Sequence, residues 1–218
     1  MTRRSAPVRF SGAIRRGRRA SPMKGETLAP GMTIGLFGGS FDPVHRGHFH
    51  VAATALKKLQ LDRLWWIVSP QNPLKQRRAG EFQRRLTAVE DAAERPRMVV
   101  SDIEDRTGIR TTAELIAVLK ARHPRVRFVW IMGADNLGQF HEWHRWRDIA
   151  ASVPIAVIAR PQDPIRARLS PMARELAATR ISETHAHTLA KSSPPGWTYL
   201  TERLHSEASS RLRGDPPR

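Results

Sequence analysis

Two histidines three residues apart, His45 and His48, are the side chains best suited to chemistry in this chain. They follow Gly38, Gly39 and Ser40, where glycines allow close approach to a ligand and positive φ angles, and the serine adds a hydroxyl donor. If both imidazoles lie in the first turn of a helix, they face one point, and the unpaired backbone N–H groups there favour an anion. This combination predicts a site for a phosphate chain.

A metal site and a purely structural role are the alternatives for His45 and His48. A catalytic zinc ion needs a third protein ligand, and none accompanies this pair at a matching spacing. The later stretch HEWHR resembles the zinc-protease helix motif, but His141 and His144 are three residues apart where that motif needs four. We therefore expect no metal site built from side chains.

The residues that must position this site alternate between short apolar runs and amphipathic stretches. The predicted strands are Thr33–Phe37, Arg63–Val68, Met98–Ser101, Arg127–Met132, Pro154–Ala159 and Trp197–Leu200. The predicted helices are Gly47–Leu59, Glu81–Ala93, Thr112–Arg122, Trp143–Ser152 and Pro164–Ala178. Residues 181–196 are expected to form a loop, and a short final helix is expected after the last strand.

Strands that alternate with helices predict an α/β fold, a doubly wound parallel sheet covered by helices on both faces. The length of 218 residues suits a single domain. Right-handed crossovers place ligands at the carboxyl ends of the strands, near the point where the strand order reverses. The predicted phosphate site follows the first strand and therefore belongs to that edge.

The chain is strongly basic, with a formal net charge of +17 and no cysteine. Residues 1–30 hold eight basic residues and one acidic residue without helical periodicity, which predicts a disordered basic tail before a domain at residues 31–218. Targeting and nucleic-acid binding are the alternatives for this tail. A basic body favours anionic substrates. The lack of cysteine fits a reducing compartment, and we expect a cytoplasmic protein without a membrane span.

The stretch GGSFDPVHRGH, residues 38–48, resembles the nucleotide-binding signature of the nucleotidylyltransferase superfamily, whose core is His-x-Gly-His. Its full form is similar to that of bacterial nicotinate-nucleotide adenylyltransferases. Three further stretches resemble the same family: SPQNPLK at residues 69–75, RTTAEL at 110–115 and GADNLGQFHEWHRWRDI at 133–149. The resemblance covers about residues 32–161 well and the remainder loosely.

The resemblance implies a Rossmann-like nucleotidylyltransferase fold and the transfer of the adenylyl group of ATP to nicotinate mononucleotide. The products are nicotinate adenine dinucleotide and pyrophosphate, in NAD biosynthesis. The attacking phosphate is already ionised at neutral pH, so the enzyme has to align two phosphates and stabilise charge rather than remove a proton. Mg²⁺ is expected to arrive with ATP, held mainly by phosphate oxygens and water.

The same resemblance assigns catalytic roles to His45 and His48. It assigns ATP and its phosphates to Gly38, Gly39, Ser40, Phe41, Lys75, Asp135, Ser206 and Arg211. It assigns the pyridine nucleotide to Thr112, near which backbone N–H groups would receive the carboxylate, and to Trp143, which would stack on the ring. A solvated basic loop is the alternative for Lys75, and a helix cap is the alternative for Asp135.

The C-terminal motif departs from the family pattern, Ser-Ser-Thr-x-Ile-Arg. Ser206 and Arg211 keep their spacing, whereas Ala208 lacks the threonine hydroxyl and Glu207 adds negative charge. Either Ser206, Arg211 and helix amides suffice for ATP, or this segment is displaced and binds ATP poorly; we favour the first.

Two other functions compete with this interpretation. A sister nucleotidylyltransferase would act on nicotinamide mononucleotide or phosphopantetheine, although the phosphopantetheine branch commonly has threonine where this chain has His45. A basic nucleic-acid-binding protein with a degenerate nucleotide site is the alternative from another class, and the intact His45 and His48 count against it. We expect nucleic acid to be contacted only non-specifically, through the basic tail.

Overall fold

A computed structural model describes residues 26–70, 80–93, 95–159 and 169–201. Within these ranges, a seven-stranded sheet has the order β3-β2-β1-β4-β5-β7-β6, with neighbouring strands parallel. The strands are β1 (Thr33–Gly39), β2 (Arg63–Val68), β3 (Met98–Ser101), β4 (Arg127–Gly133), β5 (Ile155–Ile158), β6 (Arg180–Ile181) and β7 (Trp197–Leu200). The order reverses between β1 and β4, which confirms the predicted doubly wound α/β sheet.

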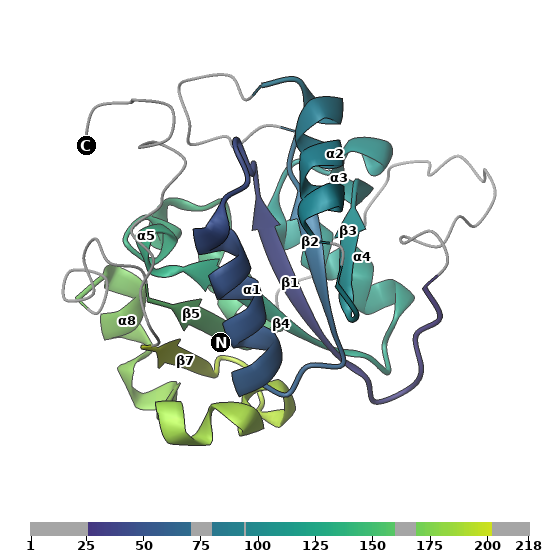
Figure 1. The fold of residues 1–218 in the computed structure, drawn as a ribbon. Coiled ribbons are helices and arrows are strands. Elements are labelled where there is room, and N and C mark those ends of the chain that lie inside the picture. Colours follow the sequence, from purple (N-terminus) through teal and green to yellow (C-terminus); the bar gives the residue numbers. More distant parts are fainter. Residues whose placement is uncertain (1–25, 71–79, 94, 160–168, 202–218) are drawn as a thin grey trace, which may run out of the picture.

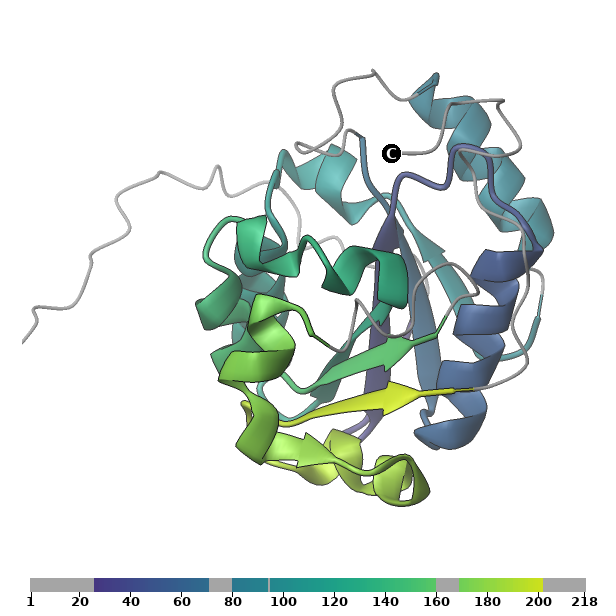
Figure 2. The same ribbon diagram turned by 90° about the vertical axis from the view of Figure 1, so that its left-hand side faces the viewer.

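Helices cover both faces of this sheet (Figures 1 and 2). They are α1 (Arg46–Lys58), α2 (Phe82–Ala92), α3 (Ile103–Thr107), α4 (Thr112–Arg122), α5 (Ala134–Leu137), α6 (Trp146–Ser152) and α8 (Pro171–Glu175), with 3-10 helices η1 (Phe140–Glu142), η2 (Ala177–Thr179) and η3 (Glu183–Lys191). The apolar residues of α1, α2 and η3 belong to one core cluster, and those of α4, α5, α6 and α8 belong to the other.

The two cores explain why the predicted strands read as continuous apolar runs. Alternate residues of a strand point to opposite faces, so Trp66 packs in the core with α1 and α2, whereas its neighbours Trp65 and Ile67 pack in the core with α4. Both sides of a parallel sheet between helix layers are dry, so neither face needs polar residues.

The helix predicted at Trp143–Ser152 begins only at Trp146. The preceding Arg145 has a φ of 55°, a left-handed conformation that interrupts the helical turn. Trp143 and Trp146 therefore do not share a helix, which corrects the predicted start of this helix at Trp143.

The stretch at residues 181–196 is not a plain loop, because it contains η3 and the end of β6. The prediction also missed the short elements α3 and α5. Within the predicted helix Pro164–Ala178, the described part contains the shorter α8, and residues 160–168 lie outside the described residues. The predicted final helix also lies outside them.

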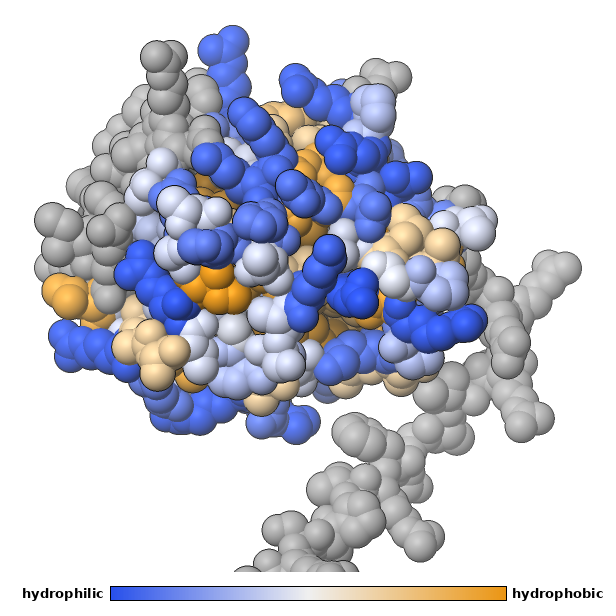
Figure 3. Space-filling view, turned by 90° about the horizontal axis from the view of Figure 1, so that it is seen from below, coloured by the Kyte–Doolittle hydropathy of each residue, from blue (hydrophilic) through white to orange (hydrophobic). Residues whose placement is uncertain are grey.

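The chain just before β1 contacts the domain. Glu26 pairs with Arg63 at the start of β2 (3.5 Å), and Leu28 packs against the core. Residues 26–30 are thus attached to the body, and the predicted tail boundary at residue 30 stays a prediction. Seen from below, this end of the sheet carries many hydrophilic side chains between smaller apolar areas (Figure 3). Across the described ranges, the helices are too short or too polar for a membrane span.

Candidate active site

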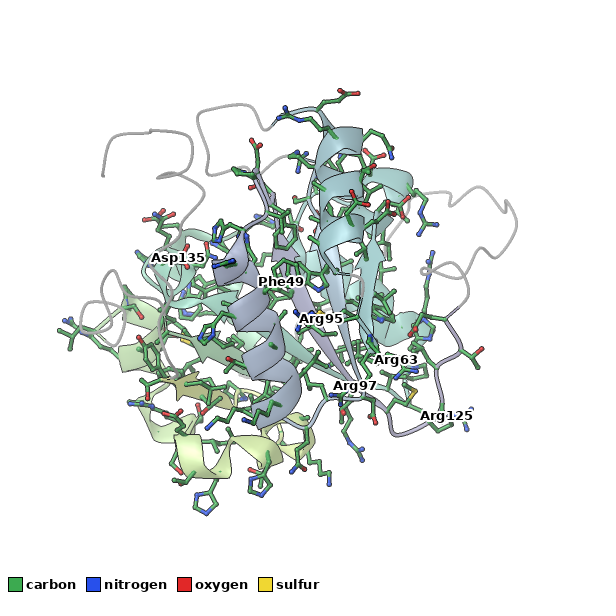
Figure 4. The ribbon with its side chains drawn as sticks, viewed as in Figure 1. Phe49, Arg63, Arg95, Arg97, Arg125 and Asp135 are labelled. Carbon is green, nitrogen blue, oxygen red and sulfur yellow. The ribbon has the colours of Figure 1, made fainter. Side chains whose placement is uncertain are left out.

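The candidate site lies at the carboxyl ends of β1 and β4. These two strands are neighbours, and the chain leaves them towards opposite faces of the sheet. The β1–α1 loop, residues 40–45, connects β1 to the first turn of α1 at this edge (Figure 1). Asp135, in the first turn of α5, belongs to the same edge because α5 directly follows β4 (Figure 4). Loops and helix N-termini thus converge where a doubly wound sheet binds its ligands.

His45 and His48 form a reciprocal cap on α1. His45 is the N-cap residue, and its Nδ1 accepts a hydrogen bond from the backbone N–H of Gly47 (3.0 Å). The Nδ1 of His48 accepts one from the backbone N–H of His45 (3.3 Å). The two rings stack, with centroids 3.8 Å apart and planes inclined by 27°. The predicted placement of both histidines at a helix start is confirmed.

This cap determines which ring nitrogen carries the hydrogen. A ring nitrogen that accepts a hydrogen bond has no hydrogen, so these bonds assign the hydrogen of each neutral imidazole to Nε2. The stacked rings of His45 and His48 then each carry their N–H group at Nε2. Because the backbone N–H groups of Gly47 and His48 bond to His45, the ring N–H groups are the candidate donors for an anion.

Gly38 and Gly39 do not use the positive φ angle that glycine allows, and their predicted contact with phosphate stays a prediction. Both lie in β1, and neither has a positive φ angle. A Cβ atom on Gly38 would lie 2.5 Å from Cη2 of Trp130, and one on Gly39 would lie 3.1 Å from the ring of Phe41. Packing against aromatic rings therefore requires glycine at Gly38, whatever a ligand needs on the other side.

The left-handed residue of the loop is Phe41, with a φ of 46°. This conformation costs a non-glycine residue on the order of 1 kcal/mol, which the surrounding packing must offset. The ring of Phe41 is buried and makes edge contacts with His48 (5.1 Å) and Phe37 (5.3 Å). The side chain of Phe41 thus packs against the ring of His48, and its predicted contact with phosphate stays a prediction.

Arg85 of α2 is buried beside this loop, with 2 % of its surface exposed. Its Nε donates to the carbonyl of Gly80 (2.9 Å), its Nη1 to the carbonyls of Ser40 (2.6 Å) and Ser69 (2.8 Å), and its Nη2 to that of Pro70 (2.9 Å). Burial lowers the pKa of Arg85, yet a guanidinium remains a cation at neutral pH. One side chain thus joins the residues that follow β1 and β2.

Glu104 of α3 is a buried carboxyl group at the same edge of the sheet. Burial raises its pKa to about 7, while a hydrogen bond with Ser69 and the charge of Arg110 act in the opposite direction. Ser69 is therefore held from two sides, because its carbonyl accepts from Arg85 and its side chain bonds to Glu104.

Glu104 is expected to make the protein less stable as pH rises. Its unfolded form loses a proton near pH 4.5, whereas the folded form keeps it until about pH 7. Stability from this group is therefore present at low pH and is lost between these values, by up to about 3 kcal/mol. From pH 5 to pH 8, the free energy of unfolding of Glu104→Gln should therefore rise relative to that of the wild type. Urea denaturation at both pH values measures this difference.

The exposed Glu90→Gln on α2 is the matched control for Glu104→Gln, because it removes a carboxylate from the surface of the same protein. A Glu104→Gln difference that is the same at pH 5 and pH 8 would contradict the assignment.

The remaining predicted residues lie at several places. Thr112 is half-buried at the first position of α4, and Thr111 caps this helix by accepting from the N–H of Glu114 (3.3 Å). Trp143 is half-buried, and its ring lies edge-on to those of Trp130 (6.0 Å) and Phe140 (5.3 Å). The predicted helix start at Thr112 is confirmed.

Two further predicted residues can be placed. Ser40 is buried at the end of β1, and Asp135 is exposed in the first turn of α5, whose N-cap residue is Gly133. The alternative of Asp135 as a helix cap is thus wrong. The predicted phosphate ligands Lys75, Ser206 and Arg211 lie outside the described residues.

Sequence reasoning missed Arg85 and Glu104. A signal existed for Arg85, because it shares the buried stripe of α2 with Leu86 and Val89. A charged residue in the apolar stripe of an amphipathic helix needs buried partners. Glu104 gave a weaker signal, since it belongs to a helix of only five residues that the pattern did not predict.

Comparison with known proteins agrees with the family resemblance of the sequence motifs. Residues 36–210 match the family model described as "Cytidylyltransferase-like". A protein of Ruegeria pomeroyi named "Probable nicotinate-nucleotide adenylyltransferase" is 49% identical over 84% of this chain and 86% of its own length. A protein of Cereibacter sphaeroides with the same name is 48% identical over 84% of this chain and 96% of its own.

A solved structure has the same fold. Nicotinic acid mononucleotide adenylyltransferase of Plasmodium falciparum, complexed with NaAD, superposes with a TM-score of 0.65 at 17% identity, over 84% of this chain and 83% of that one. At this identity the likeness concerns the fold alone, and the curated relatives carry the family assignment. The chain belongs to the cytidylyltransferase-like family and, within it, to the nicotinate-nucleotide adenylyltransferases.

Proposed function

We infer that this enzyme transfers the adenylyl group of ATP to nicotinate mononucleotide, giving nicotinate adenine dinucleotide and pyrophosphate in NAD biosynthesis. The observation that carries this function is the capped pair of His45 and His48 in a chain 48–49% identical to named nicotinate-nucleotide adenylyltransferases. The relatives favour neither a phosphopantetheine acceptor nor a nucleic-acid-binding role.

The test is an assay of the purified protein with ATP and each candidate acceptor: nicotinate mononucleotide, nicotinamide mononucleotide and phosphopantetheine. Pyrophosphate release and the dinucleotide product are both measured. Fast product formation with nicotinate mononucleotide supports the function, and release of pyrophosphate with phosphopantetheine alone would overturn it.

The residues at the site would act by holding charge rather than by moving protons. The attacking phosphate is already an anion, so the reaction requires two phosphates in line and donors for the charge on the transferred group and the leaving pyrophosphate. We propose that the Nε2–H groups of His45 and His48 supply these donors. Gly38, Gly39, Ser40 and the backbone of Phe41 would line the path of the phosphates.

For the other predicted ligands, we propose that Asp135 accepts hydrogen bonds from ribose hydroxyls. Thr112 and Trp143 would receive the pyridine nucleotide. Lys75, Ser206 and Arg211 remain proposed phosphate ligands on the strength of the family resemblance.

Nucleotidyltransferases of this family generally use a divalent metal ion with ATP. We propose Mg²⁺, which needs few protein ligands when phosphates are present. The described residues contain no group of three or more histidine, aspartate or glutamate side chains able to hold a metal ion. The donors around His45 and His48 suit the phosphates rather than the cation, so phosphate oxygens and water would hold most of the metal's coordination sites.

We also propose that residues 1–25 contribute non-specific adhesion to polyanions and nothing to catalysis. All eight basic residues of the predicted tail lie in this stretch, whereas Glu26 and Leu28 contact the domain. A chain that begins at residue 26 should keep its turnover and elute from heparin at lower salt than the full chain. Loss of turnover in the shortened chain would contradict this proposal.

We also propose a cytoplasmic location, where ATP is made and used.

A further inference from the structure

Four of the five N–H groups of Arg85 end on backbone carbonyls that belong to three separate segments. Ser40 follows β1, Ser69 and Pro70 follow β2, and Gly80 precedes α2. These carbonyls lie at the carboxyl-terminal edge of the sheet, where their negative ends compensate the buried cation. The planar fork of a guanidinium can satisfy acceptors in several fixed directions at once, which a lysine ammonium cannot do.

The tie at Ser40 continues to the histidines through Phe41. Phe41 directly follows Ser40 and holds a left-handed φ of 46°, a conformation that persists only when its neighbours restrain it. The carbonyl of Ser40 is restrained by Arg85 (2.6 Å), and the ring of Phe41 lies edge-on against His48 (5.1 Å). A shift at Ser40 would therefore move the ring that supports His48.

A second contact fastens the same loop to α2. The carboxylate of Asp42 accepts from the backbone N–H of Gly80 (3.1 Å), and the carbonyl of Gly80 accepts from Arg85 (2.9 Å). The β1–α1 loop is thus connected at two points, Ser40 and Asp42, to the residues around the start of α2. Arg85 takes part directly in the first connection and through Gly80 in the second.

We propose that Arg85 is a positioning residue for adenylyl transfer: its buried guanidinium sets the β1–α1 loop against the end of β2 and so fixes the orientation of His48. This inference rests on the proposed function for its kinetic test. Arg85 is 2 % exposed, so it acts through Ser40 and Phe41 and does not touch substrate.

Arg85→Lys tests the proposal because it keeps the charge and removes the fork. Turnover should fall about 10- to 100-fold, the scale expected when catalytic groups are slightly misplaced, while KM for both substrates changes less than turnover. Measurements are made well below the melting temperature of the variant, with circular dichroism to show that it is folded. Arg122→Lys, exposed in the last turn of α4, is the matched control and should keep wild-type turnover.

A second measurement does not depend on activity. The ring nitrogens of His45 and His48 are observed by nuclear magnetic resonance in the protein without substrates, and Arg85→Lys should shift the His48 signals whereas Arg122→Lys should not. If Arg85→Lys does not fold, Phe41→Leu tests the same connection and should also shift His48 and lower turnover.

Three outcomes separate the possibilities. Wild-type turnover together with unchanged His48 signals in folded Arg85→Lys would overturn the positioning role and leave only a contribution to stability. If Arg85→Lys shifts the His48 signals but the wild-type protein is inactive with every acceptor, the role of Arg85 is supported and the proposed function is contradicted. Lower turnover with unchanged His48 signals would also overturn the proposal, because the effect would not pass through His48.

Discussion

Replacing His48 by alanine lowers the turnover of adenylyl transfer by about 10²–10³-fold, the usual effect of losing one preorganised donor. The Nδ1 of His48 accepts from the N–H of His45 (3.3 Å), so the proposed donor to the substrate is Nε2–H. This donor matters most when charge builds up on the transferred group, so KM for ATP should change much less than turnover. Steady-state kinetics with both substrates saturating measures the effect.

Asparagine separates the two roles of His45. The side-chain oxygen of asparagine is a good N-cap acceptor and can replace Nδ1 towards Gly47, but it offers no donor at the position of Nε2. His45→Asn should therefore lose turnover as His45→Ala does, whereas only His45→Ala should lose the cap and about 1 kcal/mol of stability. His187→Ala, on an exposed face of η3, is the control. Full turnover in both His45→Asn and His48→Ala would show that this pair is not catalytic.

Nicotinate mononucleotide is expected to exceed the amide form about 10²-fold or more in kcat/KM. A carboxylate received by fixed N–H donors gains about 1.5–3 kcal/mol per good hydrogen bond, and each 1.36 kcal/mol is a factor of ten. The start of α4 at Thr112 offers such donors at the right edge of the sheet. The amide would set its own N–H group against them. Parallel kinetics with the two mononucleotides measures the ratio.

Trp143→Ala tests the predicted stacking on the pyridine ring. The side chain is half-buried and rests edge-on against Trp130 and Phe140. Its loss should raise KM for both mononucleotides and leave most of the ratio between them, and Trp143→Phe should have a smaller effect. Equal rates with the acid and the amide in the wild-type enzyme would show that the acceptor is wrong, even if adenylyl transfer is observed.

The parts of the site that could be predicted depend on neighbours in the chain. The strand before Gly38 and the helix after His45 follow from local periodicity, and the reciprocal cap joins residues only three positions apart. Their arrangement at one edge follows from the handedness of parallel crossovers. The reversal of the strand order between β1 and β4 could thus be inferred without coordinates.

The errors concern residues whose role depends on distant parts of the chain. The positive φ angle that glycine allows is not used at Gly38; Trp130, on another strand, fills the space where a Cβ atom would lie. The spacing of Trp143 and Trp146 appeared helical, and only the left-handed backbone of Arg145 separates them. The role of Arg85 depends on carbonyl groups, which any sequence provides at every residue, so nothing in the sequence identifies its partners.

The position of β1 inside the sheet, between β2 and β4, has a consequence for how the protein folds during its synthesis on the ribosome. Thr33 of β1 pairs with Arg127 of β4, although α1, β2, α2, β3, α3 and α4 all lie between them in the chain. During synthesis, β1 can pair with β2 early, but its other edge stays open until β4 has emerged. An open strand edge pairs readily with other chains. The incomplete chain is therefore prone to aggregation at this stage, until β4 with Trp130 pairs with the open edge of β1.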